Sequence, residues 1–463
     1  MKNPLMLHKA SVVVLVAGLV AAAMPLGWAQ QAPGAAAAAP DIAIVGTAPP
    51  EPAAAQEGDL RAGVAAADIP PPQGMWEVMM GGYFNPQQIP QGVHDPLRAK
   101  ALVLDNGQVR VCIVTSDLLS IPVNLRNAAL AKLSPAAGLA PERVSICASH
   151  THSGPGGLTE IKFAAKFLGD FHPAEADYVA GKIAAAIESA AANLRPAKFG
   201  YARVKVPGFT HNRRGNELIK PVVAVLRVDG ADDQPLALLV NFGTHPVFLD
   251  DDNRLFSADF VGYMLAAIEA ERGGVAMFAN GAQGDQNPDQ DEKLPAGYAR
   301  AEAYGKRMAR EALKIAAQAQ TQRRVAMASI LGELQLPQPT VEIETRRVPI
   351  MGLRIGGVLL LAVPGEASAE VGLDIEGRAR QLGFDLPLVI GLANEEIAYI
   401  LARDDYLRGE YEARMSFFGP DLGAVMVAGM TELARRMQPR AKVYSSLPAG
   451  RFAESSLSYG AWR

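Results

Sequence analysis

Short apolar runs alternate with longer segments of helical period between residues 60 and 437. The runs are rich in Val, Ile and Leu and are bounded by turn residues, which predicts buried strands; they cover residues 101–105, 109–114, 144–148, 222–228, 236–242, 275–280, 356–363 and 386–390. Segments with helical spacing cover residues 123–133, 174–194, 260–271, 298–317, 367–381 and 424–437. The first two runs flank Asp105-Asn106-Gly107, a turn typical of a β-hairpin. Alternating strands and helices predict an α/β fold with an extensive mixed β-sheet structure flanked by helices.

The N-terminal segment differs from the rest in composition. Lys2 and Lys9 lie before and at the edge of the apolar stretch 10–20, and Gly27-Trp28-Ala29 fits a cleavage site before Gln30. We expect residues 1–29 to be a signal peptide, because the stretch is shorter than the ~20 residues that an uncleaved membrane anchor needs. Residues 30–58 are mostly Ala, Pro, Gly and Gln, which predicts a disordered linker. The folded part is expected over 59–463, in an exported protein that is periplasmic or secreted.

Charge and cysteine content narrow the protein class. The formal net charge of the 463 residues is −4 and no block of basic residues occurs, which argues against nucleic-acid binding. The two cysteines, Cys112 and Cys147, lie in apolar runs. We predict buried free thiols, and a single disulfide stays open as the alternative if the two strands are neighbours.

Polar side chains follow several of the predicted strands, where ligands bind in α/β folds. His150 and His152 come after residues 144–148, and His245 follows the run that ends at 242. Glu366 and Tyr399 follow two later runs. In an extended strand, positions i and i+2 share one face, so the first two imidazoles are expected to point the same way. Imidazole nitrogen and carboxylate oxygen suit Zn²⁺.

The segment 149–157, SHTHSGPGG, resembles the signature of the neutral/alkaline non-lysosomal ceramidases. Further similar segments follow in family order, at residues 62–71, 92–104, 257–260, 363–366 and 391–394. The resemblance implies one catalytic domain over 59–463. It also implies a zinc site whose ligands are His150, His245, Glu366 and Tyr399.

The same resemblance assigns the substrate side. It implies that His152 contacts the substrate or a developing oxyanion. Arg213 resembles a substrate-side Arg of the family, and Gly154 and Gly156 belong to the open turn beside the histidines.

The chain departs from the family in two places. Where the family has a Ser proposed as catalytic, this sequence has Asn287, within Gly284-Asp285-Gln286-Asn287-Pro288. An amide cannot be an activated nucleophile, but it can donate a hydrogen bond to an oxyanion. The proton carrier stays open between Asp285 and His152. The family also carries a C-terminal immunoglobulin-like domain, which we do not expect here because such domains need about 100 residues.

These features predict a zinc-dependent hydrolase that cleaves an amide bond of N-acyl lipids such as ceramide. Two alternatives are a zinc hydrolase of another amide or ester and an inactive lipid-binding homologue. The acidic run 250–252 is expected to be a solvated loop, with a structural Ca²⁺ or Mg²⁺ as the alternative. The expected partner is a small-molecule or lipid substrate. A peripheral contact with a membrane surface and the oligomeric state are left open.

Overall fold

The computed structural model describes residues 41–45, 55–75, 78–343 and 347–439 of the chain. These residues belong to one compact unit that begins at residue 39. The predicted signal peptide, much of the predicted linker and the C-terminal segment 440–463 lie outside the described residues. No helix within the described ranges is long and apolar enough to cross a membrane.

The larger sheet has eight strands in the order β13-β11-β10-β8-β3-β5-β6-β7. Their bounds are β3 Arg61–Asp68, β5 Arg98–Asp105, β6 Arg110–Ser116, β7 Val144–Ala148, β8 Arg195–Lys205, β10 Val222–Gly230, β11 Pro235–Phe242 and β13 Val275–Asn280. The pairs β6–β7 and β11–β13 are parallel and the others antiparallel, so the sheet is mixed. The edge strands β7 and β13 nevertheless contact each other, which shows that the sheet curls.

The second sheet has six strands, five in the order β1-β15-β16-β17-β19, with β2 also paired to β15. Their bounds are β1 Ile42–Val45, β2 Gln56–Asp59, β15 Arg324–Gln335, β16 Arg347–Ile355, β17 Val358–Ala362 and β19 Leu386–Ile390. The strand β1 and most of β2 fall inside the predicted disordered linker 30–58, so that prediction is wrong at these residues. The disorder prediction rested on the high Ala and Pro content of residues 30–58 as a whole. It overlooked the short run Ile-Ala-Ile-Val, which has high β propensity and pairs with β15, as β2 also does.

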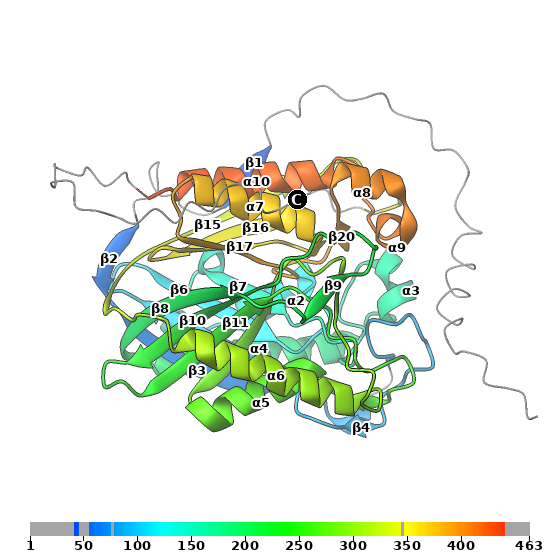
Figure 1. Ribbon diagram of the computed structural model, residues 1–463, viewed down its shortest axis with the longest axis horizontal. Helices are drawn as coiled ribbons and strands as arrows, with labels where there is room; N and C mark the ends of the chain where they lie inside the picture. The colour runs from blue at the N-terminus through cyan, green and yellow to red at the C-terminus, as the bar shows by residue number, and fades with distance from the viewer. Residues whose placement is uncertain (1–40, 46–54, 76–77, 344–346, 440–463) are drawn as a thin grey trace, which may run out of the picture. The chain divides into compact units, whose positions relative to one another are not determined.

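Helices cover the outer face of each sheet, so the unit has four layers: helices, sheet, sheet, helices (Figure 1). The helix bounds are α2 Val123–Ala131, α3 Ala165–Leu168, α4 Pro173–Ala192, α5 Phe260–Arg272, α6 Tyr298–Ala316, α7 Ala369–Gln381, α8 Arg403–Arg408, α9 Glu410–Arg414 and α10 Leu422–Arg436. Helices α2, α4, α5 and α6 pack on the larger sheet, and α7 and α10 on the smaller. The inner faces of the two sheets pack against each other through residues such as Leu102, Leu239 and Leu360.

The predicted α/β class with mixed sheets is confirmed, and every predicted helix and strand is present within a few residues. The strands β8, β15 and β16 were not predicted. They carry Arg, Lys and Glu between their apolar residues, and they become strands because neighbouring strands complete their hydrogen bonds. The two cysteines are buried free thiols, as predicted. They lie on opposite faces of the larger sheet, Cys112 toward the helices and Cys147 toward the other sheet.

Short strands bring the segments beyond the sheets together. They are β4 Gly92–Val93, β9 Thr210–Asn212, β12 Leu255–Phe256, β14 Gln286–Pro288, β18 Glu366–Ala367 and β20 Tyr399–Ile400. Asn280, at the end of β13, donates from its side-chain amide to the carbonyl of Ser149 at 2.9 Å and of Thr244 at 3.0 Å. This amide ties the loop after β7 to the loop after β11, so the histidines of both loops meet.

Candidate active site

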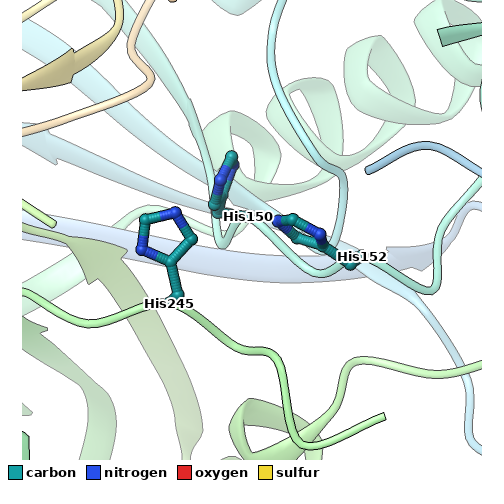
Figure 2. A group of neighbouring side chains, drawn as sticks. All are labelled: His150, His152 and His245. Carbon is teal, nitrogen blue, oxygen red and sulfur yellow. The ribbon is translucent and has the colours of Figure 1, made fainter. Parts of the chain in front are cut away.

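Three imidazoles converge at this junction (Figure 2). The candidate ligand atoms of His150, His152 and His245 lie within 4.8 Å of one another. The ring centroid of His150 is 4.9 Å from that of His152 and 4.8 Å from that of His245. Sequence reasoning paired His150 with His152 through strand alternation, but β7 ends at Ala148 and His150 has a φ of 76°. The loop therefore aims the rings, and this strained backbone is typical of a functional position.

Backbone carbonyls set the tautomers of two of these histidines. The Nδ1 atom of His150 is 2.8 Å from the carbonyl oxygen of Leu119, and Nδ1 of His245 is 3.0 Å from that of Gln286. A carbonyl oxygen only accepts, so each Nδ1 carries the hydrogen. Burial, reinforced by the charge of Arg213, lowers the pKa of His245 to about 4, so this ring is neutral at pH 7. Its Nε2 then carries a lone pair.

Glu366 faces both Nε2 atoms. Its Oε2 lies 3.3 Å from Nε2 of His150 and 3.1 Å from Nε2 of His245. Burial alone would raise the pKa of Glu366, but the two imidazoles outweigh it and hold the pKa well below the usual range. The two nitrogens and one oxygen match the donor set and open coordination of a catalytic zinc site, so the residues present fit this group.

Tyr399 and Arg213 complete the polar end of the site. Parallel pairing of β18 with β20 places Glu366 opposite Tyr399. Arg213 donates from Nη2 to the Tyr399 hydroxyl at 2.9 Å and from Nε to Glu412 at 2.7 Å. Its Nη1 lies 3.4 Å from Nε2 of His245. Arg213, predicted on the substrate side, therefore also holds the tyrosine in place.

His152 is the imidazole without a partner. Both of its ring nitrogens are buried and have no hydrogen-bond partner within the described part of the chain. Its ring stands edge-on to that of Tyr83, with centroids 4.8 Å apart. Burial, then the neighbouring His150 and His245, lower the pKa of His152 well below the usual range, so the ring is neutral. A neutral imidazole with free nitrogens can donate to or accept from a substrate, so the role in substrate contact stays a prediction.

Asn287 and Asp285 have different hydrogen-bond partners in the structure. Oδ1 of Asn287 accepts from Nη1 of Arg213 at 3.4 Å, which leaves the amide hydrogens of Asn287 to donate elsewhere. The Asp285 carboxylate accepts from Asn212 at 2.8 Å, from Gln286 at 2.8 Å and from the backbone of Ala369 at 2.9 Å. Asp285 therefore braces the strands around the site, whereas Asn287 lies beside Arg213.

The two predicted glycines shape the loop rather than line the main pocket. A Cβ on Gly156 would come within 2.3 Å of the Met79 carbonyl oxygen, so only glycine allows the two backbones this close. The carbonyl of Gly154 accepts from the amide of Gly81 at 3.1 Å. These contacts bring the segment around Gly82 against the ring of His152, where a Cβ on Gly82 would be 2.5 Å from Cγ.

An apolar pocket opens onto this group. Its polar lining includes His150, His152, Glu366 and Tyr399. The rest of its lining is mostly apolar, with Phe84, Leu119, Ile161, Phe163, Phe167, Leu168, Ile343, Ile397, Met415, Phe417 and Phe418. Most of these side chains lie in loops and short helices several residues beyond the predicted strands. The search for polar residues directly after strands therefore did not identify them.

Sequence reasoning missed four acidic or phenolic residues of the site. Glu412 accepts from Arg213 and Arg214, and Tyr411 lies against Tyr399 with centroids 5.8 Å apart. Glu395 and Glu396 line the pocket and directly follow Asn394. The rule that polar residues after a strand mark a site would have found this acidic pair, since β19 ends at Ile390.

The acidic run 250–252 is exposed, as expected of a solvated loop. Across the described ranges, the histidine group is the one cluster of three or more side chains with metal-ligating geometry. The alternative of a structural Ca²⁺ or Mg²⁺ site stays a prediction.

Comparison with known proteins identifies the family. Residues 60–302 match the family described as "Neutral/alkaline non-lysosomal ceramidase, N-terminal". The chain belongs to this family. Among its ceramidase relatives, the neutral ceramidase of Pseudomonas aeruginosa is 23% identical over 501 residues, which cover 85% of this chain and 74% of that protein. The neutral ceramidase of Mycobacterium tuberculosis is 24% identical over 245 residues, covering 46% of this chain and 38% of that protein.

Solved ceramidase structures share the fold. The crystal structure of the P. aeruginosa neutral ceramidase superposes with a TM-score of 0.74 at 23% identity, covering 85% of this chain and 76% of that one. A structure described as "Ceramidase complexed with C2" also gives 0.74, at 22% identity, with 85% and 77% covered. The predicted family and fold are thereby confirmed.

Proposed function

We propose that this protein is an exported zinc-dependent hydrolase that cleaves the amide bond of N-acyl lipids of the ceramide type. One observation carries the proposal: two imidazoles and one carboxylate converge at the polar end of an apolar pocket. Membership of the ceramidase family and the likeness to a ceramidase complexed with C2 support the lipid substrate class.

His150, His245 and Glu366 would hold the zinc ion, with Tyr399 as the fourth protein ligand. Bound Zn²⁺ supplies Lewis-acid activation of water and of an acyl carbonyl. The carbonyls of Leu119 and Gln286 orient the two imidazoles before any ion arrives.

The apolar walls would bind the acyl chain and thereby exclude water from it. Each buried methylene contributes about 0.8 kcal/mol, so a chain of moderate length supplies most of the binding free energy. His152 and Asn287 lie on the polar side of the bound amide in this proposal. Each would donate a hydrogen bond to the oxygen that becomes negative in the transition state.

The proton carrier is proposed to be His152 rather than Asp285. The ring nitrogens of His152 have no other partner in the described structure, whereas the Asp285 carboxylate already accepts three hydrogen bonds. Export rests on the N-terminal sequence alone. A peripheral membrane contact is proposed because an N-acyl lipid must leave a bilayer to enter the pocket.

A second candidate function is hydrolysis of a different amide or an ester. Asn287 favours it, because a site without the family's Ser would suit a substrate with a better leaving group than a ceramide amine.

The test is hydrolysis of a fluorescent short-chain ceramide by the purified protein, with metal content measured on the same sample. Zinc-dependent turnover that is lost on chelation and restored by Zn²⁺ is the expected result. Bound zinc with ester turnover and no ceramide turnover would favour the second candidate. Lipid binding without any turnover would support the remaining alternative, an inactive lipid-binding homologue.

A further inference from the structure

The pocket wall carries two adjacent acids, Glu395 and Glu396, that the proposed chemistry does not use. They lie between β19 and β20, on the segment that ends at the candidate ligand Tyr399. Positive φ angles of 54°, 68° and 63° occur at three non-glycine residues of this segment, Leu392, Asn394 and Ala398. Strained backbone of this kind clusters at functional sites, so the segment is a place to look for a further role.

The hydrogen bonds of Glu395 give it a structural task. Its Oε1 accepts from the backbone amide of Val123 at 3.2 Å and from that of Glu396 at 2.8 Å. Val123 is the first residue of α2, and the first amides of a helix have no partner within the helix. Glu395 therefore joins the pocket segment to the start of α2, and its place in the wall needs no ligand.

Glu396 is held differently. Its Oε1 accepts from the backbone amide of Ala398 at 2.6 Å, two residues further along the same segment. This bond holds one side of the carboxyl group against its own backbone. The second oxygen, Oε2, is buried and has no partner within the described part of the chain. Buried polar atoms in proteins are normally paired, so Oε2 calls for a polar group on the ligand.

The chemistry of the wall favours a hydroxyl as that group. A carboxyl oxygen accepts when the acid is ionised and can donate when it is protonated, and a hydroxyl both donates and accepts. A hydroxyl therefore matches Oε2 in either state, whereas an ammonium or an amide N–H only donates. A neutral hydroxyl also costs far less to move from water into an apolar pocket than a charge does. Lipids of the ceramide type are N-acylated amino alcohols, so they carry a hydroxyl close to the amide bond.

We propose that Glu396 is a specificity-determining residue whose free oxygen binds a substrate hydroxyl on a carbon close to the hydrolysed amide bond. The inference rests on the proposed hydrolase function and narrows its substrate class to N-acyl lipids with such a hydroxyl. The hydroxyl can belong to the amine half or to the second carbon of the acyl chain, because the hydrogen bond to Oε2 is the same in both cases.

The test uses three amides that differ by one hydroxyl. N-dodecanoyl propylamine has none, N-dodecanoyl ethanolamine has one on the amine half, and N-(2-hydroxydodecanoyl) propylamine has one on the acyl chain. One of the two hydroxylated amides should be hydrolysed with a kcat/KM at least about tenfold above that of the first, the ratio expected of one hydrogen bond to a carboxyl group. The preferred amide identifies the half of the substrate that faces Glu396.

Substitutions at Glu396 connect this preference to the free oxygen. Glu396→Met keeps the length and removes both oxygens, so the preference should fall to about threefold or less while the rate on N-dodecanoyl propylamine stays the same. Glu396→Gln keeps a side chain that can donate to and accept from a hydroxyl, so it should retain most of the preference. Glu160→Met, at an exposed acid next to the lining residues Thr159 and Ile161, is the matched control and should change neither value.

Three kinetic results would overturn the inference: no preference for either hydroxylated amide, a preference that persists in Glu396→Met, or an equal loss on all three amides in that variant. The last result would mean that the hydrogen bond to Ala398 supports the site instead. If Glu396→Met does not fold, as judged by its thermal unfolding, Glu396→Ala takes its place, since it also removes both oxygens.

A binding measurement separates this inference from the proposed function. If no amide is hydrolysed, the same three compounds serve as ligands in calorimetry. Tighter binding of one hydroxylated amide that is lost in Glu396→Met would then support recognition of a hydroxyl by Glu396 and reject the hydrolase, and equal binding would reject both. Hydrolysis of all three amides with equal kcat/KM would support the hydrolase and reject the inference.

Discussion

The polar end of the pocket, where His150, His245 and Glu366 meet, differs from the pocket walls in how its side chains are held. At the polar end, backbone carbonyls orient the imidazoles and strand pairing places Glu366. Along the walls, aromatic rings pack edge-on, such as Phe163 with Phe417 at a centroid separation of 4.9 Å.

The difference suggests two roles in the proposed function: the polar end would carry out the reaction, and the apolar walls would select the substrate. Directional hydrogen bonds hold atoms to within a few tenths of an ångström, which a metal site requires. Apolar packing tolerates changes of shape, so the walls can accept chains of different length. Substitutions at the polar end should therefore affect kcat for every substrate, and substitutions in the walls should affect substrates according to their chains.

The largest effect is expected at the polar end. His150→Ala should abolish metal binding and reduce hydrolysis by about a thousandfold or more, because loss of a ligand removes the Lewis acid. Metal analysis and turnover on one sample measure both. His94→Ala is the control, since His94 is exposed and stacks on Tyr298. Full metal content in His150→Ala would contradict the ligand assignment.

A smaller loss is expected at Asn287. Asn287→Ala should lower kcat by about a hundredfold with little change in KM, the usual cost of one oxyanion donor. Asn287→Asp keeps the size and removes the donor, so it should be equally impaired. Steady-state kinetics on a short-chain substrate measures this, and an active Asn287→Asp variant would show that donation by the amide is not needed.

The walls should respond differently. Phe163→Ala should lower kcat/KM for a dodecanoyl substrate by about tenfold and leave an acetyl substrate nearly unchanged, because the ring is part of the apolar lining proposed to hold the acyl chain. Leu407→Ala, at a residue that is 62% exposed, serves as the control. Equal losses on both substrates would mean that the ring supports the polar end instead.

The smallest effect concerns a buried acid outside the pocket, at Glu175 near the start of α4. Burial raises its pKa from 4.5 to about 8, and its Oε2 has no partner within the described residues. The unfolded chain loses this proton at lower pH than the folded protein, so the free energy of unfolding falls as pH rises from 4.5 to 8. Glu175→Gln should remove this loss and raise stability at pH 8 by about 1–3 kcal/mol, with little change at pH 4.

Thermal unfolding at both pH values measures the effect, with activity as a second readout. Unchanged activity of Glu175→Gln is expected, because this acid is not part of the pocket lining. A loss of activity in Glu175→Gln would mean that this acid supports the site.

The sequence by itself predicted most of the helices and strands and indicated several candidate site residues. Apolar period and turn residues predicted β7 and β13 to the residue, and polar residues after strands indicated His150, His245 and Glu366. These features are local, because strand and turn formation depend on neighbouring residues. The resemblance to the ceramidases extended them to Tyr399 and Arg213.

Only the tertiary structure decided how these residues meet. A left-handed loop conformation orients His150. The side-chain amide of Asn280 joins two loops, at Ser149 and Thr244, that lie 95 residues apart in the chain. The pairing of Arg213 with Glu412 joins residues that lie 199 positions apart in the chain. Such contacts leave no periodic trace in the sequence, because each joins two residues whose local patterns are independent of one another.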